Sequence, residues 1–306
     1  MSFYVIGAGL AGLFASAVLQ HDCLEVLERQ PEVPNNHHAI LRFRTGVFGD
    51  AVNIPFNKVP VLKSYVPFVG NIVGDSISYS LKTNGSATLR SSISADGKVV
   101  DRYIAPTDLV NQLVRRVGNK VAFEYAFGTS DLGSDRKYIS TMPMPVLMDI
   151  LGYEDRPKFE SVAGYVVTAK LTNCSVYATL YLPDPHDRCY RVSITGDQFI
   201  AEYVDPPMGT AANEIRRLSR YFGLNNLVDI ADEPMVHMQR YAKILPINER
   251  QRKTFMAWAT DEHNIYSFGR FATWRPSLQL DDLVNDLKRI QEFARSGPYE
   301  RRKANA

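Results

Sequence analysis

The sequence predicts an α/β fold, in which a Rossmann-like nucleotide-binding domain carries an inserted antiparallel β-sheet substrate domain. Three segments support this prediction. A strand, a glycine-rich turn and a helix follow one another within 4–19, alternating strands fill 161–204, and an amphipathic helix is expected over 280–294. Because the last helix is expected to complete the domain that the first strand begins, the antiparallel segment is predicted to separate two halves of one nucleotide site.

The N-terminal segment has the residue spacing of a dinucleotide-binding βαβ unit. Its first strand, Tyr4-Val5-Ile6, runs into Gly7-Ala8-Gly9-Leu10-Ala11-Gly12, and the apolar run 24–27 ends at Glu28. The three glycines are expected to permit a tight turn, a close approach of a pyrophosphate and packing of the helix on the sheet. The N–H groups at the helix N-terminus would then face the phosphates.

Glu28 is expected at the C-terminal end of the second strand. A carboxylate at this position can accept hydrogen bonds from both hydroxyls of a ribose. The same negative charge would repel a 2′-phosphate, so the sequence argues against NADP as the ligand of this site.

Composition and charge exclude several other classes of protein. The 306 residues include 35 basic and 33 acidic ones, and the resulting net charge of +2 gives no general attraction to nucleic acid or to an anionic membrane. No apolar run approaches the length of a membrane span, and no targeting segment is seen before the first strand. Cys23, Cys174 and Cys189 form no C-x-x-C pair, which indicates a cytoplasmic protein without a dithiol redox centre. We predict no metal site.

Two segments in the first half of the chain define the expected connections. Alternation within 77–81 predicts a small antiparallel sheet in 76–101. The strand 138–141 is followed by prolines and a short helix over 146–151, which suits a return into the nucleotide-binding sheet. The remaining expected elements are a helix at 107–114, a strand at 120–125, strands at 164–171, 175–182, 190–194 and 198–203, a helix at 211–222, and strands at 235–247 and 264–268.

These elements give a discontinuous domain organisation. We predict a nucleotide-binding domain over 1–60, 100–155 and 262–296, a substrate domain over 61–99 and 156–261, and a tail over 297–306.

Three segments of the chain, 5–28, 138–147 and 267–287, resemble a family of FAD-dependent enzymes that includes amine oxidases, protoporphyrinogen oxidase and UDP-galactopyranose mutase. The resemblance implies FAD as the cofactor. Within the last segment, Gly269-Arg270 followed by Thr273-Trp274-Arg275 is most similar to the mutase branch. Pro276 and Trp274, however, stand where that branch has tyrosines that hold a diphosphate.

The resemblance also implies which residues contact the cofactor. Arg29 would flank the adenosine, Val121 would offer its backbone to the adenine edge, and N–H groups of the turn at Leu280 and Asp281 would lie near the flavin N1/O2 edge. Simple helix capping is the alternative role for the aspartate. The full set expected at FAD is Gly7, Gly9, Leu10, Ala11, Gly12, Glu28, Arg29, Arg44, Val121, Gly269, Arg270, Leu280 and Asp281.

Candidate catalytic residues come from two further segments. His38 belongs to a stretch similar to the one that passes the flavin in the mutases, and Lys243 is similar to the lysine that positions water near flavin N5 in many amine oxidases. Tyr241 shares its side of the strand with Lys243 and would line the pocket. Arg42 and Arg44 alternate on one side of a strand, where they would bind the flavin diphosphate or an anionic substrate. The alternatives are a solvated histidine pair, a surface lysine and an exposed strand face.

The function that follows from this resemblance is FAD-dependent oxidation of a C–N bond. An amine, free or carried on a polymer, would lose a hydride to flavin N5, water would hydrolyse the imine, and molecular oxygen would reoxidise the flavin. One alternative is a mutase-like reaction with reduced flavin as nucleophile. Another is a flavoprotein that binds FAD for structure or partner recognition. A further alternative is an oxidase acting on an amine of a modified nucleic acid base, which is supported only by scattered basic residues.

Overall fold

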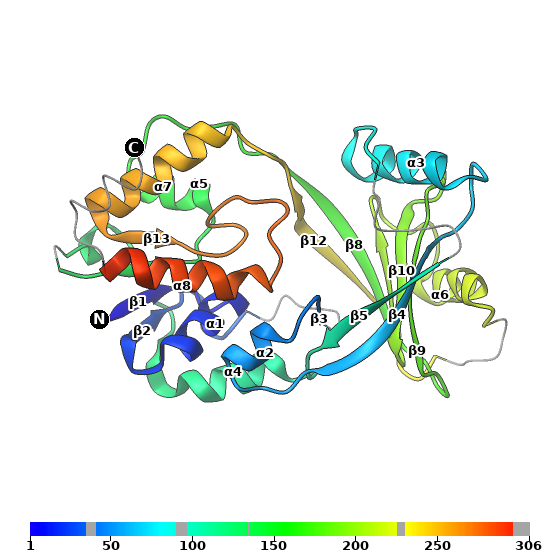
Figure 1. Cartoon of the computed structure of the whole chain (residues 1–306), viewed down its shortest axis with the longest axis horizontal. Helices are drawn as coiled ribbons and strands as arrows, with labels where there is room; N and C mark the ends of the chain where they lie inside the picture. The colour runs from blue at the N-terminus through cyan, green and yellow to red at the C-terminus, as the bar shows by residue number, and fades with distance from the viewer. Residues whose placement is uncertain (35–40, 90–96, 134, 225–229, 296–306) are drawn as a thin grey trace.

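The computed structural model describes residues 1–34, 41–89, 97–133, 135–224 and 230–295. It contains two sheets that lie side by side along the long axis of the molecule (Figure 1). One is a parallel sheet flanked by helices, and the other is a larger, mainly antiparallel sheet. This arrangement confirms the predicted fold class.

The smaller sheet has the strand order β13-β7-β1-β2-β6, and all its described pairs are parallel. Its strands are β1 (Phe3–Ile6), β2 (Cys23–Leu27), β6 (Val121–Ala122), β7 (Tyr138–Ser140) and β13 (Ile265–Ser267). Successive strands run outward from β1 through β2 to β6, and the chain then returns to the other side of β1 as β7. In open α/β sheets a ligand binds outside the carboxyl ends of the strands at such a reversal, so the β1–β7 junction locates the expected site.

Helices cover both faces of the parallel sheet. α1 (Leu10–Leu19), α4 (Leu109–Val117) and α8 (Asp282–Arg295) share one apolar core, and α5 (Met144–Ile150) and α7 (Glu249–His263) share a second. The short helix α2 (Val47–Ala51) contacts α8. The return of 138–141 into this sheet and the C-terminal helix are as the sequence predicts.

The larger sheet has the order β12-β8-β11-β10-β9-β4-β5-β3, with one parallel pair, β4–β9. Its strands are β3 (Arg42–Phe43), β4 (Asn57–Tyr65), β5 (Lys98–Ile104), β8 (Ser161–Lys170), β9 (Val176–Tyr181), β10 (Cys189–Gly196), β11 (Gln198–Tyr203) and β12 (Met235–Ile244). Helix α6 (Ala211–Ser219) packs on an apolar face of this sheet. We call the opposite face the polar face, because it carries the buried residues Thr168, Thr179, Ser193 and Thr195.

The predicted small sheet within 76–101 is wrong for its first half, which forms helix α3 (Ile72–Asn84). Asn71 caps the helix by accepting a hydrogen bond from the N–H of Gly74, and Gly85 ends it in the left-handed region. The buried residues Asp75, Tyr79 and Thr83 lie four apart, which is the helical repeat. Polar residues on the buried side produced the misleading alternation, because the helix packs on the polar face.

Other differences concern the ends of elements. The strand expected over 120–125 is reduced to β6, and no element was predicted at 249–263, where Asn248 caps helix α7. The predicted domain boundaries at 60/61, 99/100 and 261/262 fall inside β4, β5 and α7. Among the described residues, no helix combines the length and apolar character needed to cross a membrane.

Candidate functional site

The glycine turn between β1 and α1 is fixed by close contacts. Gly7 has φ +96°, and a Cβ on it would lie 2.5 Å from Thr141 Oγ1, while a Cβ on Gly12 would lie 1.9 Å from the Gly7 carbonyl oxygen. A Cβ on Gly9 would have no atom within 4 Å. Gly7 and Gly12 are therefore needed by the packing of the turn, whereas Gly9 leaves room for a ligand to approach the backbone.

The N-terminus of α1 suits an anionic group. Its first turn contains no acidic residue, and no side chain caps it at Gly9. The first N–H groups of an α-helix have no carbonyl partner within the helix, and they carry the positive end of the helix dipole. Leu10 and Ala11, which were predicted to contact FAD, begin this turn. The geometry matches a pyrophosphate-binding helix start.

Glu28 lies beside the glycine turn, as expected. Its side chain is buried, and its two oxygens accept hydrogen bonds from the N–H groups of Ala8 (2.7 Å) and Gln30 (2.8 Å). A carboxylate has about four acceptor positions, so both oxygens keep a lone pair for a ribose hydroxyl. Arg29 is exposed next to it, and Val121 pairs with Val26 across β2 and β6.

The carboxyl ends of β7 and β13 contain buried polar atoms that lack partners. Within the described part of the chain, Ser140 Oγ, Ser267 Oγ and Arg270 Nε are buried without a hydrogen bond. Each such atom costs about 1–3 kcal/mol, and the three belong to the edge of the sheet where a ligand is expected. Burial lowers the pKa of Arg270, and the nearby Tyr190 partly offsets this.

The segment after β13 contacts the first turn of α1. Gly269 has φ +90°, and a Cβ on it would lie 3.1 Å from the Cβ of Ala11. The structure thus brings together the N-terminal glycine turn and Gly269 and Arg270, which are far apart in the sequence.

Asp281 has protein partners at the start of α8. Its carboxylate accepts hydrogen bonds from the N–H groups of Arg44 (3.1 Å) and Thr45 (2.8 Å) and from the Thr45 hydroxyl (2.8 Å). Leu280 packs against the apolar core. The N–H groups of the next residues, Asp282 and Leu283, bond to carbonyls within the turn. Asp281 therefore fastens the start of α8 to the segment that follows β3.

Arg42 reaches the polar face. Its guanidinium donates to Thr179 Oγ1 (2.9 Å) and Ser193 Oγ (3.0 Å). Burial lowers its pKa to about 10, and the nearby Arg191 contributes to this shift. Strand β3 ends at Phe43, and the side chain of Arg44 is exposed. Arg42 and Arg44 therefore do not continue one strand face as the alternation predicted.

The predicted catalytic residues are in different situations. Lys243 lies at the polar face, where its Nζ donates to the Thr83 carbonyl (2.6 Å) and lies 4.6 Å from the centre of the Tyr190 ring. Tyr241 is half exposed, with its ring 6.5 Å from that of Phe271 in the loop after β13. His38 lies outside the described residues. Catalytic roles for these residues stay predictions.

Sequence reasoning did not identify Lys63 or Tyr190. Lys63 is partly buried on β4, opposite Thr179 of β9, and Tyr190 donates from its hydroxyl to Glu202 (3.2 Å), which also forms an ion pair with Arg191. The signal available in the sequence was a lysine that, in an alternating strand, falls on the same side as valines. Only the pairing of β4 with β9 shows that this position faces the polar side.

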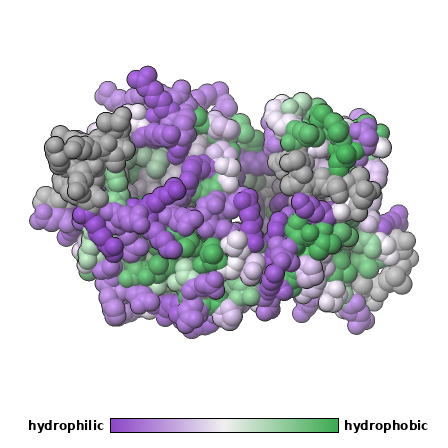
Figure 2. Space-filling model, in the orientation of Figure 1, coloured by the Kyte–Doolittle hydropathy of each residue, from purple (hydrophilic) through white to green (hydrophobic). Residues whose placement is uncertain are grey.

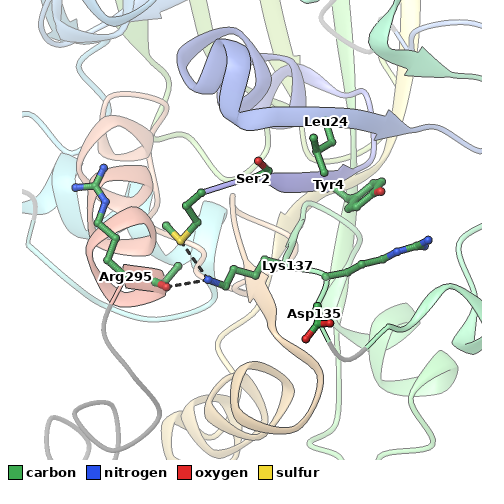
Figure 3. A pocket seen from close by; sticks show the side chains of 9 residues that line it. Ser2, Tyr4, Leu24, Asp135, Lys137 and Arg295 are labelled. Atoms are coloured by element: carbon green, nitrogen blue, oxygen red, sulfur yellow. Dashed lines mark hydrogen bonds between the residues drawn. The ribbon is translucent and has the colours of Figure 1, made fainter.

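A separate hollow lies at the opposite end of the parallel sheet. Figure 3 shows Ser2, Tyr4, Leu24 and Lys137 around it, close to the amino ends of β1, β2 and β7, and its volume is about 590 Å³. Lys137 donates to the carbonyl of Ala294 (3.1 Å). Ligands of such sheets bind at the carboxyl ends, so this hollow is not the nucleotide site. No group of metal-binding side chains is found among the described residues.

Comparison with known proteins supports the fold. No protein-family model and no curated protein matches the chain. A solved structure of reduced UDP-galactopyranose mutase is similar with a TM-score of 0.66 and 12% identity, covering 98% of each chain. An oxidoreductase from Methanosarcina mazei has a TM-score of 0.56 and 12% identity, covering 95% of this chain and 100% of its own.

A flavoprotein/dehydrogenase from Cytophaga hutchinsonii is similar with a TM-score of 0.50 and 12% identity, covering 95% of this chain and 76% of its own. At this level of identity the likeness establishes the architecture: a parallel sheet with a glycine turn, joined to a large antiparallel sheet over nearly the whole chain.

Proposed function

We propose that this protein binds FAD and catalyses an FAD-dependent oxidation or reduction. The observation that carries the proposal is the open approach to Gly9 beside an uncapped α1. The buried Glu28 and the polar atoms without partners at the carboxyl edge fit the ribose and flavin portions of a dinucleotide. When bound, the flavin supplies the capacity to accept or donate two electrons.

The chain's own residues have distinct roles in this proposal. The first turn of α1 binds the pyrophosphate, Glu28 binds the ribose, and the loop from Gly269 closes the site on the other side. Arg270 of this loop interacts electrostatically with Tyr190, which belongs to the larger sheet. The substrate therefore binds between the carboxyl edge of the parallel sheet and the polar face.

Within this chemistry we propose oxidation of an amine at its C–N bond. Support comes from the resemblance of the sequence to amine oxidases and from Lys243, which shares the neighbour Tyr190 with Arg270. In this proposal the ammonium group of Lys243 holds a water molecule for reaction with oxygen.

A mutase-type isomerisation is the second candidate. The concentration of arginines on the polar face favours an anionic substrate such as a sugar nucleotide, and the similarity to the mutase structure extends over 98% of both chains. Such an enzyme needs prior reduction and gives no net oxidation.

The first test is the absorbance spectrum of the purified protein, followed by anaerobic addition of a panel of amines. We expect an oxidised flavin band that one class of amine bleaches, with peroxide formed in air. A flavin that stays oxidised with every amine, together with turnover only after chemical reduction, would favour the mutase. A protein that neither retains nor binds FAD would overturn the proposal.

A further inference from the structure

Positive charge gathers on the polar face around β4. We call Arg42, Lys63, Arg102 and Arg191 the cationic cluster. They come from four different strands, β3, β4, β5 and β10, and strand pairing places them on one face of the sheet. Among the described residues, Glu202 supplies a carboxylate at this cluster, and both of its oxygens accept hydrogen bonds from Arg191. The cluster therefore carries more positive than negative charge.

Arg42 is held in a way that suits a ligand. Two of its nitrogens donate to hydroxyl groups, Thr179 Oγ1 and Ser193 Oγ, both on buried residues. Neutral hydroxyls fix the orientation of a guanidinium without neutralising its charge. An arginine has five N–H donors in a planar fork, so Arg42 keeps donors for a planar or tetrahedral anion.

Lys63 is linked to Arg42 through Thr179, to which the Arg42 guanidinium donates. It is the register partner of Thr179 on β9 and of Lys98 on β5. Burial lowers the pKa of Lys63 to about 8, and the positive charges of Arg102, Arg42, Arg191 and Arg44 add to this effect. The charged and titratable groups around Lys63 and Arg42 are Lys98 and Arg102 of β5, Arg44 after β3, Tyr181 of β9, Tyr79 of α3, Arg191 of β10 and Glu202 of β11.

We propose that Arg42 and Lys63 form a receptor for an anionic group on the substrate, a carboxylate or a phosphate, and that Lys63 takes up a proton when this group binds. The proposal rests on the proposed function only in placing the substrate on the polar face. A bound anion supplies the negative charge that the cluster lacks, and its field favours the ammonium form of Lys63 over the neutral amine.

Proton uptake makes the affinity depend on pH. Without a ligand, Lys63 loses its proton above a pKa of about 8. The anion binds the protonated form more tightly, so its affinity falls as the pH rises, by up to about tenfold per pH unit while only the free form is deprotonated. An arginine in place of Lys63 stays charged throughout this range.

Calorimetric titration with sulfate and with oxalate tests the proposal. Neither probe titrates between about pH 7 and about pH 9.5, and ionic strength is kept constant because charge interactions are screened by salt. FAD is present in excess so that the phosphate-binding turn is filled. We expect binding to weaken at least about tenfold between these pH values, with proton uptake seen as a dependence of the heat on the buffer. Preference for oxalate would identify a carboxylate, and preference for sulfate a phosphate-like group.

Three variants separate this site from other cations. Lys63→Met should abolish most of the binding at the lower pH, whereas Lys63→Arg should keep it and lose the pH dependence. Lys58→Met is the matched control, because Lys58 lies on the same strand but is exposed and paired with Asp101. Equal affinity at both pH values, or equal effects of Lys58→Met and Lys63→Met, would overturn the proposal. Failure to bind FAD would overturn the proposed function alone, because the comparison of Lys63→Met with Lys58→Met still separates this site from the turn at α1 when flavin is absent.

Discussion

Gly9 and Gly12 belong to one motif but meet different surroundings. The Cβ position of Gly12 lies 1.9 Å from the Gly7 carbonyl, while that of Gly9 is open. Gly12→Ala should therefore displace α1 and lower the free energy of unfolding of the apoprotein by about 1–3 kcal/mol. Gly9→Ala should leave stability nearly unchanged, because its φ of −66° suits alanine, but should weaken FAD binding.

Denaturant unfolding of the FAD-free protein and a flavin titration measure the two effects separately. If Gly9→Ala destabilised the apoprotein as much as Gly12→Ala, this would contradict the open space found around the Cβ position of Gly9.

Lys243 provides a second prediction for a single residue. In the oxidase proposal, Lys243→Met should slow reoxidation of the reduced flavin by oxygen and leave anaerobic reduction by the substrate unchanged. Rapid-mixing absorbance measurements follow the two half-reactions. Lys82→Met is the control, since Lys82 also anchors α3 by donating to carbonyls, those of Leu182, Asp184 and Cys189. Equal rates of reoxidation in wild type and Lys243→Met would rule out a role for Lys243 in the reaction of reduced flavin with oxygen.

At the scale of elements, helix α3 is the one that was predicted least well from the sequence. Its buried side is polar, and exposed apolar residues Val69, Val73 and Leu81 lie on and before it, where Figure 2 shows hydrophobic surface over the helix. Hydrophobic periodicity predicts the reverse arrangement, because a helix usually buries its apolar stripe. The helix packs on a polar sheet face, and this inverts the pattern.

The attachment of α3 depends on Asp75. This residue is 1% exposed, and one of its oxygens accepts from the N–H groups of Phe68 (3.0 Å) and Val69 (2.7 Å). Asp75→Ala leaves both donors without this partner and should lower stability by about 1–3 kcal/mol. Leu81→Glu, on the exposed side, should change stability by less than about 0.5 kcal/mol. Urea unfolding of both variants checks the contrast, and a large effect of Leu81→Glu would show that the apolar side is covered.

At the scale of the whole molecule, the sequence identified one sheet better than the other. The parallel sheet has a local signature, in which turn, helix and acid follow at fixed spacing, so β1, α1, β2 and Glu28 are where they were expected. Strands β8 to β12 of the larger sheet were also expected, whereas no strand was predicted at β4. Their order was not predictable, because β4 pairs with β9 through contacts between distant segments.

The same reason explains which site residues were missed. Glycine turns have conformational and steric requirements that a sequence reveals. Lys63 comes close to Arg42, and Tyr190 to Arg270, only through the strand order and the approach of the two sheets, so no spacing in the sequence marks Lys63 or Tyr190 as site residues. Asp281 was expected to assist a ligand, but its partners, the backbone N–H groups of residues 44 and 45, depend on the position of β3 relative to α8.

The strand order of the parallel sheet also bears on how the protein is made. On the ribosome, β1 and β2 emerge early, but Phe268, Leu283 and Leu287, which share their apolar core, emerge only after β12 has completed the larger sheet. At a synthesis rate of about 5–20 residues per second, the early strands wait on the order of ten seconds or more for these partners. During that interval Phe3, Val5 and Phe14 lack part of their final covering, so the nascent chain exposes apolar surface that the finished protein buries.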